Sequence, residues 1–513
     1  MLIRVCLTAS LLLFPVSPLL AQAQSEKKET TVTEKTEKKE KEPQKDNVVT
    51  TQHSVTIGGQ TIAYTARAGT IIMKDEEGTP KASFFFVSYT RDGADPARRP
   101  ITYSFNGGPG SASVWLHMGA LGPKRVDYQD AVGHAPQPPY RLVNNENSIL
   151  DVTDLVFIDP VTTGFSRAIP LKDDARYHGV EGDIESVGEF IRTYTTRYSR
   201  WSSPKFLAGE SYGTTRAAGL SGFLNDNGIY LNGIILISSI LNFETARFDS
   251  GNDLPFILFL PTYTATAWYH HKLPADLQAN LQSAIEQSEK FALGDYTQAL
   301  MQGDALRPEE HRRIVDTLAR LTGLSSDYVE RTNMRIRIDR FDKELLRSQR
   351  RTVGRLDSRF TGIDIDAAGE RPEYDPAHAA LTGAYTAVFN DYVRRELKYE
   401  TDLPYEVLTG RVRPWSYDKA SNRYVDVGET LRSAMSANPF LRVFVANGYF
   451  DLATPFAATR YTFGRLGLDP SIRKNLSMDF FEAGHMMYID RTAHAKLKKD
   501  IAAFIQDSMT PAP

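Results

Sequence analysis

Short apolar and alternating segments, separated by turn residues, predict the strands of a central sheet. Between residues 54 and 90, apolar and polar positions alternate around Gly58-Gly59 and residues 75–78, which is typical of strands joined by hairpin turns. After residue 100, short apolar runs alternate with helical patterns, which predicts a mostly parallel α/β sheet with helices on both faces. The expected strands are Ser54–Ile57, Thr61–Arg67, Ser83–Tyr89, Ile101–Phe105, Leu155–Asp159, Lys205–Ala208, Gly233–Ser238, Arg442–Ala446 and Ser477–Phe481.

Helical periodicity marks the remaining long segments. Gly182–Tyr198 places apolar residues on one helical face, and a further helix is expected from Thr214 to Asn225. Between about residues 250 and 417 the alternation of strand and helix stops and the pattern becomes largely helical. We therefore expect a sheet domain in two parts, 48–249 and 418–513, around an insertion at 250–417. The helices expected in the insertion are Pro274–Phe291, Pro308–Leu321 and Pro376–Leu397.

The N-terminus has the pattern of an export signal. Arg4 is followed by the apolar stretch Val5–Leu20 and by Ala21-Gln22-Ala23, a typical cleavage site. This predicts a signal peptide at residues 1–23, with an uncleaved anchor as the alternative. Residues 24–47 follow as a charged linker, in which seven acidic residues and seven lysines balance and little can be buried.

Charge and cysteine content exclude several classes of function. The 60 basic and 63 acidic residues give a net charge of −3, so the chain has no general attraction for nucleic acid or for membranes. Its one cysteine, Cys6, lies within the expected signal, which excludes a disulfide scaffold, a thiolate zinc site and a cysteine nucleophile in the mature protein. An exported protein without cysteines fits a bacterial periplasm or a secreted bacterial enzyme.

A serine in a tight turn is the strongest candidate for catalysis. Gly209-Glu210-Ser211-Tyr212-Gly213 follows an apolar strand and precedes a helix, which is the setting of a G-x-S-x-G nucleophile elbow. The two glycines permit the strained backbone that lifts the Ser211 hydroxyl above the sheet edge. A structural serine in a turn is the alternative interpretation.

A serine nucleophile needs a base and a group that orients the base. The strand from Arg442 runs into a loop that ends at Asp451, and the strand from Ser477 ends near His485. These residues follow Ser211 in the chain order Ser, Asp, His of hydrolases with this elbow. We expect His485 to accept the serine proton and Asp451 to fix the imidazole tautomer.

The loop Asn106-Gly107-Gly108-Pro109-Gly110, directly after a predicted strand, is the candidate oxyanion hole. Its Gly108 amide would act together with the amide of Tyr212, the residue after the nucleophile. A plain turn is the alternative. A phosphate-binding loop is excluded because the loop has neither the Walker lysine nor G-x-G-x-x-G spacing.

Together these segments resemble the serine carboxypeptidase family over roughly residues 54–509. The resemblance rests on residues 106–113 (NGGPGSAS), 121–123 (LGP), 157–160 with 164–166 (FIDP, GFS), 209–213 (GESYG) and 484–486 (GHM). It implies an α/β-hydrolase fold with a helical insertion that forms a lid, and removal of C-terminal residues from peptides or proteins without a metal or cofactor. It also implies that Asn106, the Gly107 amide and Glu210 bind the terminal carboxylate, and that Met486 lines the leaving-group pocket.

Three positions depart from the family pattern. Ala120 stands where the family has a second glutamate that pairs with the elbow glutamate, which puts carboxylate recognition and an acidic working pH in question. Ser104 replaces a tryptophan ahead of the glycine-rich loop, and Ser111 replaces a cysteine. An esterase or acyltransferase with the same three catalytic residues therefore stays open, as does a non-catalytic peptide-binding protein.

Two other patterns are weaker candidates for function. His270 and His271 are adjacent, so on a helix they project in different directions and make a poor metal pair. Residues 335–355 are rich in arginine, which predicts a solvated helix face, with a rim that attracts anionic substrates as the alternative.

Overall fold

The structure, a computed structural model, describes residues 45–128, 134, 136–417 and 420–510. The chain divides into residues 1–43 and 44–513. The expected signal peptide and all but the last three residues of the expected linker lie outside the described residues. Within the described residues, the Asp46 carboxylate accepts a hydrogen bond from the Ile72 amide at 2.8 Å and forms an ion pair with Arg197 at 2.6 Å.

The central sheet runs in the order β1-β2-β3-β7-β4-β9-β10-β13-β14. Neighbours from β1 to β7 pair antiparallel, and all pairs from β7 to β14 are parallel. All nine expected strands are present, and the hairpin strands are longer than predicted. The strands are β1 (Asn47–Ile57), β2 (Gln60–Lys74), β3 (Pro80–Arg91), β4 (Ile101–Phe105), β7 (Asp154–Ile158), β9 (Lys205–Glu210), β10 (Gly233–Ile237), β13 (Arg442–Gly448) and β14 (Leu476–Phe481), with the short β5 (Lys124–Val126), β6 (Leu142–Asn144), β8 (Arg167–Ala168), β11 (Thr352–Val353) and β12 (Thr361–Gly362) outside this order.

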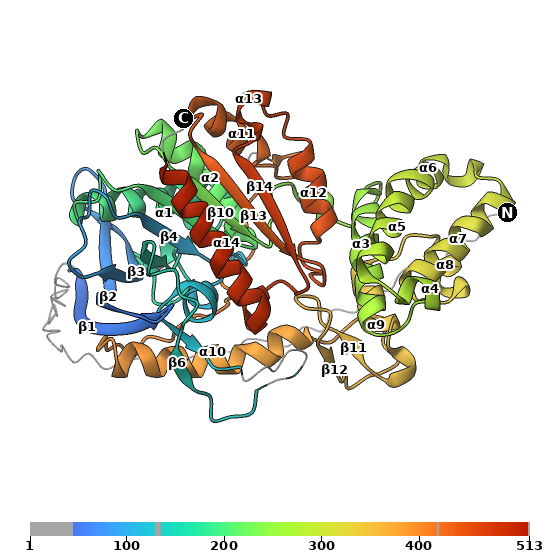
Figure 1. Cartoon of the computed structure of the whole chain (residues 1–513), viewed down its shortest axis with the longest axis horizontal. Coiled ribbons are helices and arrows are strands. Elements are labelled where there is room, and N and C mark those ends of the chain that lie inside the picture. The colour runs from blue at the N-terminus through green and yellow to red at the C-terminus, as the bar shows by residue number, and fades with distance from the viewer. Residues whose placement is uncertain (1–44, 129–133, 135, 418–419, 511–513) are drawn as a thin grey trace, which may run out of the picture. The chain divides into compact units, whose positions relative to one another are not determined.

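Helices cover both faces of the sheet (Figure 1). In β10, Ile234 and Leu236 belong to one apolar cluster and Ile235 and Ile237 to another, because successive side chains of a strand point to opposite faces. The cluster with Ile234 also includes residues of α1 (Val180–Arg197), α2 (Tyr212–Asp226) and α11 (Gly428–Ala437), and the other includes residues of α14 (Arg491–Met509). The shorter α12 (Phe456–Gly464) and α13 (Pro470–Arg473) lie between β13 and β14 in the sequence.

The insertion between β10 and β13 consists of two parts that pack differently. Its first seven helices share an apolar cluster of their own, whereas α10 (Pro376–Arg395) packs into the cluster beneath the sheet through residues such as Phe389. The expected helix Pro274–Phe291 is divided at Asn280, whose side chain accepts a hydrogen bond from the Ser283 amide at 2.9 Å and caps the second piece. The seven helices are α3 (Leu254–Tyr269), α4 (Ala275–Gln278), α5 (Leu281–Phe291), α6 (Thr297–Gln302), α7 (Pro308–Thr322), α8 (Ser326–Arg331) and α9 (Ile338–Glu344).

No helix of the described ranges is both long enough and apolar enough to cross a bilayer.

Candidate active site

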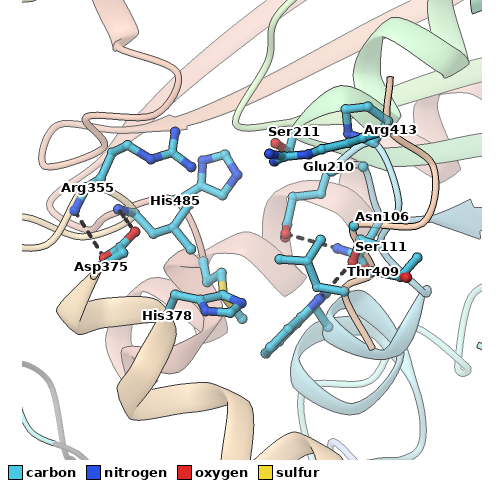
Figure 2. Close-up of a pocket in the computed structure, with 18 residues that line it drawn as sticks. Asn106, Ser111, Glu210, Ser211, Arg355, Asp375, His378, Thr409, Arg413 and His485 are labelled. Carbon is cyan, nitrogen blue, oxygen red and sulfur yellow. Dashed lines mark hydrogen bonds between the residues drawn. The ribbon is translucent and has the colours of Figure 1, made fainter. Parts of the chain in front are cut away.

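A cavity of about 420 Å³ lies where the loop after β4, the turn after β9 and the loop after β14 meet. Asn106, Gly107 and Gly108 line it from the first loop, Glu210 and Ser211 from the turn, and His485 and Met486 from the last loop. Figure 2 shows Ser211, Glu210 and Asn106 on one side of the cavity and His485 on the other, with residues of the insertion on both sides. Carboxyl ends of parallel strands meet at one edge of a sheet, which explains why segments so distant in sequence converge here.

Ser211 occupies a strained turn between β9 and α2. Its φ of 60° and ψ of −131° are unusual for a residue with a side chain, and its amide donates to the Ile237 carbonyl at 3.0 Å. A Cβ atom at Gly209 would collide with the Gly213 carbonyl, and one at Gly213 would lie 2.8 Å from the Phe105 carbonyl oxygen. The two glycines of the motif are therefore required by space at this turn.

His485 and Asp451 form a buried hydrogen-bonded pair. His485 Nδ1 lies 2.7 Å from Asp451 Oδ2, and the exposed fractions of the two residues are 3% and 0%. Three further donors reach the Asp451 carboxylate: the amides of Ala453 and Thr454 at 2.8 and 3.0 Å, and the Thr454 hydroxyl at 2.7 Å. This arrangement leaves Nε2 of the imidazole as the nitrogen that is available for proton transfer.

The loop that carries His485 is fixed by its own backbone. The His485 amide donates to the Leu356 carbonyl at 2.7 Å, and the His485 carbonyl accepts from the Ser238 hydroxyl at 2.6 Å. Burial by itself would lower the pKa of His485, but the charge of Asp451 and the hydrogen bond to it outweigh burial and raise the pKa above its ordinary value. The imidazole is thus suited to hold a proton that it receives from a neighbour.

The glycine-rich loop packs directly onto the serine turn. A Cβ at Gly107 would collide with the Tyr212 amide, so the loop approaches the start of α2 as closely as a backbone can. Gly108 has a φ of 101° and lines the cavity. The loop is held from below by Arg216, which donates to the Asn106 carbonyl at 2.6 Å and forms a fully buried ion pair with Asp183 at 2.8 Å.

Asn106 and Glu210 form a second buried couple beside Ser211. Asn106 Nδ2 donates to Glu210 Oε1 at 2.9 Å, and the Leu116 amide donates to Asn106 Oδ1 at 3.0 Å, which orients the amide group. Burial raises the pKa of Glu210 to about 7. Glu210 Oε2 makes no hydrogen bond with any described residue. Below neutral pH, therefore, this carboxyl can hold a proton that it is able to donate.

Tyrosines occupy the surroundings of Ala120, where the resemblance implied a second glutamate. A Cβ at the neighbouring Gly119 would collide with the Tyr385 hydroxyl and lie 2.5 Å from the Tyr488 ring. Both tyrosines are buried, and neither hydroxyl has a hydrogen-bond partner at standard distance and angle among the described residues. The Tyr488 hydroxyl nevertheless acts on the Glu210 carboxyl and lowers its pKa, against the larger effect of burial. The sequence analysis did not single out these two residues.

The other two departures have different structural consequences. Ser104 is fully buried in β4, and the wall of the cavity is provided by Trp115. Ser111 orients this tryptophan, because its hydroxyl oxygen accepts a hydrogen bond from Trp115 Nε1 at 2.9 Å. Met486 is buried and lines the cavity next to His485. His270, outside the cavity, uses Nε2 in a 2.7 Å hydrogen bond with the Ser358 carbonyl.

Two arginines of the insertion also line the cavity and were not predicted individually. Arg355 follows β11 and Arg413 lies in the segment after α10. Arg355 falls at the end of the arginine-rich stretch, which is a weak signal in the sequence, whereas nothing in the sequence around Arg413 marks it.

Comparison with known proteins relates the chain to a family of peptidases. The model of a family described as serine carboxypeptidase matches residues 59–482. The chain is 31% identical over 147 residues to the pheromone-processing carboxypeptidase KEX1 of Saccharomyces cerevisiae, covering 27% of this chain and only 19% of the yeast protein. The crystal structure of Kex1(delta)p, a prohormone-processing carboxypeptidase from the same yeast, matches with a TM-score of 0.52 at 15% identity, over 86% of this chain and 92% of that chain. These matches confirm the predicted α/β-hydrolase fold.

Proposed function

The chain belongs to the serine carboxypeptidase family, and we propose that it hydrolyses C-terminal peptide bonds through an acyl-enzyme formed on Ser211. One observation carries this proposal: the His485–Asp451 pair and the Asn106–Glu210 couple meet on either side of the same serine. The first pair supplies a base for a hydroxyl nucleophile. The second supplies donors for a carboxylate, so that the cleaved bond is the last one in the chain.

In the proposed reaction, His485 Nε2 accepts the Ser211 proton while the serine oxygen attacks the carbonyl carbon. Asp451 stabilises the imidazolium, and the amides of Gly108 and Tyr212 stabilise the oxyanion. His485 then gives the proton to the leaving amine. A water molecule, activated in the same way, attacks the acyl-enzyme and releases the shortened peptide.

We assign recognition of the terminal carboxylate to Asn106, the Gly107 amide and Glu210, with Met486 beside the leaving group. The carboxylate of a peptide has a pKa of about 3.5 and is ionised at the working pH. Protonated Glu210 can donate to it, whereas ionised Glu210 would repel it. Because the pKa of Glu210 is raised to about 7, preference for a free C-terminus should be fully present in acid and lost as the pH rises through about 7.

The test compares an N-blocked dipeptide with its C-terminal amide between about pH 5 and pH 8, a range that spans the ordinary pKa values of glutamate and histidine. We expect strong preference for the free acid that fades above neutral pH, and loss of turnover by about 10⁴-fold or more in Ser211→Ala. Full activity of Ser211→Ala would refute the proposal.

The same assay separates the alternative functions. Cleavage of amides and aryl esters as well as of the free acid would favour an esterase or acyltransferase. Ala120, in the place of the second glutamate, is the observation that keeps this alternative open. Failure of a fluorophosphonate to label Ser211, together with absence of turnover, would indicate a non-catalytic peptide-binding protein.

We also propose that residues 1–23 direct export of the protein to a bacterial periplasm or medium, on the basis of their charge and apolar pattern. N-terminal sequencing of the exported chain should begin at Gln24. A chain that starts at Met1 in the exported fraction would favour an uncleaved anchor.

A further inference from the structure

Arg355 and Arg413 have exposed side chains that line the active-site cavity from two segments of the insertion. Figure 2 shows Arg355 on the side of His485 and Arg413 on the side of Ser211, with both guanidinium groups directed toward the same space. Within the described residues, neither guanidinium forms an ion pair with an acidic side chain. Two cationic groups are therefore available to whatever occupies the cavity.

Other arginines of the insertion do form ion pairs. Arg335 pairs with Asp253 at 2.6 Å, and Arg411, only two residues before Arg413, lies 3.6 Å from the carboxylate of Glu406. Acidic side chains nearby thus compensate these two arginines, which lie outside the cavity lining, whereas Arg350 and Arg351 of the same region form no ion pair with a described residue. The two that face it are left without such a partner.

The acidic groups that line the cavity offset only part of this charge below neutral pH. Asp375 supplies one carboxyl group against two arginines, and its oxygens accept hydrogen bonds from three backbone amides, at 3.0 to 3.1 Å. Glu210 is mostly uncharged in acid, because burial raises its pKa to about 7. Two histidines also line the cavity. Burial lowers the pKa of His378, whereas Asp451 outweighs the effect of burial at His485 and raises its pKa. The cavity is therefore electropositive in the pH range in which Glu210 can receive a carboxylate.

We propose that Arg355 and Arg413 form an anion subsite that selects peptides with an acidic side chain in one of their last two residues. This inference rests on the proposed carboxypeptidase function, in which Asn106 and Glu210 hold the terminal carboxylate. With that carboxylate bound and the last peptide bond at Ser211, the side chains on either side of the bond extend into the rest of the cavity. A guanidinium group offers two parallel N–H donors to a carboxylate, which suits it to this role.

The test uses four N-blocked dipeptides in matched pairs, with glutamate or glutamine at the last or at the penultimate position and alanine at the other. The alanine–alanine dipeptide serves as reference. Assays at about pH 6 and low salt keep the substrate glutamate ionised, since its pKa is about 4.3. We expect kcat/KM to be about fivefold higher for glutamate than for glutamine at one of the two positions, which is the effect of a partly exposed ion pair. Added salt should reduce this ratio.

Arg355→Gln and Arg413→Gln should each lower the glutamate-to-glutamine ratio, and the double variant should bring it to about one. The ratio is the informative quantity, because Arg355 also acts on the pKa of His485 and its loss changes overall rates. Arg411→Gln is the matched control, since Arg411 lies outside the cavity lining, and it should keep the wild-type ratio.

Equal cleavage of glutamate and glutamine peptides, with normal hydrolysis of the reference, would overturn this inference and leave the proposed function intact. Loss of the preference for free acid over amide in the arginine variants would also overturn it, because the arginines would then bind the terminal carboxylate itself. Absence of hydrolysis of all five peptides would refute the proposed function and this inference together.

Discussion

Glu210, which lines the cavity beside Ser211, and Asp451, which pairs with His485, are both buried carboxyl groups, and their surroundings differ. Asp451 accepts hydrogen bonds from two amides and one hydroxyl and also pairs with His485. Glu210 accepts one standard hydrogen bond, from Asn106, and its second oxygen has none from the described residues. Burial disfavours the charged form of Glu210, which has few donors to offset this effect, whereas several donors surround the Asp451 carboxylate. The two groups thus differ in the number of donors more than in the depth of burial. Asp451 is suited to stabilise the imidazolium of His485, and Glu210 is suited to hold a proton.

Removing the charge of Asp451 should have the largest effect on this comparison. Asp451→Asn keeps the size of the side chain but favours the wrong imidazole tautomer, so kcat should fall by about 10³–10⁴-fold while the fold is retained. Steady-state kinetics and circular dichroism would check this. Asp391→Asn, on the exposed face of α10, is the control and should be unaffected. A loss of less than tenfold in Asp451→Asn would remove Asp451 from the catalytic residues.

The next largest effect is expected at Glu210. Glu210→Gln keeps an N–H donor for the substrate carboxylate at every pH, so preference for the free acid should no longer fall as the pH rises through about 7. Glu210→Ala lacks this donor, and KM for free-acid peptides should rise by about 10–100-fold, the strength of a hydrogen bond to a charged group. The acid-to-amide ratio measured across pH checks both variants. A normal decline with pH in Glu210→Gln would mean that another group titrates.

The sequence predicts the fold well where the pattern is strong. β4 has the predicted bounds, β10 ends one residue earlier than predicted, and β7 is shifted by one residue at both ends, because buried parallel strands are short apolar runs with clear limits. The prediction of one continuous helix at Pro274–Phe291 was wrong, because the apolar pattern does not distinguish a capping residue at Asn280 from a residue within a helix. The packing of α10 beneath the sheet could not be predicted, since periodicity identifies an apolar face but not its partner.

The candidate site is predictable where its residues share a short motif. Ser211 and Glu210 lie within one turn, and Asn106 and Gly108 lie within one loop, so local sequence indicates their chemistry. Tyr488 differs, because tyrosine is common in apolar cores and nothing local relates it to Glu210. Its position three residues after His485 is the only signal that could have suggested a place near the site.

Tyr488 allows the finest test of the contrast between the two carboxyl groups. Its hydroxyl lowers the pKa of Glu210, because a hydrogen bond to the carboxylate favours the charged form. Tyr488→Phe should therefore raise this pKa and move the loss of free-acid preference to higher pH. Above neutral pH, KM for free-acid peptides should therefore fall, because more of Glu210 stays protonated, with little change for amides.

The matched control for this variant is Tyr64→Phe, which removes another buried tyrosine hydroxyl, on β2 and outside the residues that line the cavity. Both substitutions should have similar effects on thermal stability, but only Tyr488→Phe should move the pH profile. A profile that stays unchanged in Tyr488→Phe, or that moves equally in both variants, would assign Tyr488 to packing alone. The pKa of Glu210 would then be set by burial, without a contribution from the Tyr488 hydroxyl.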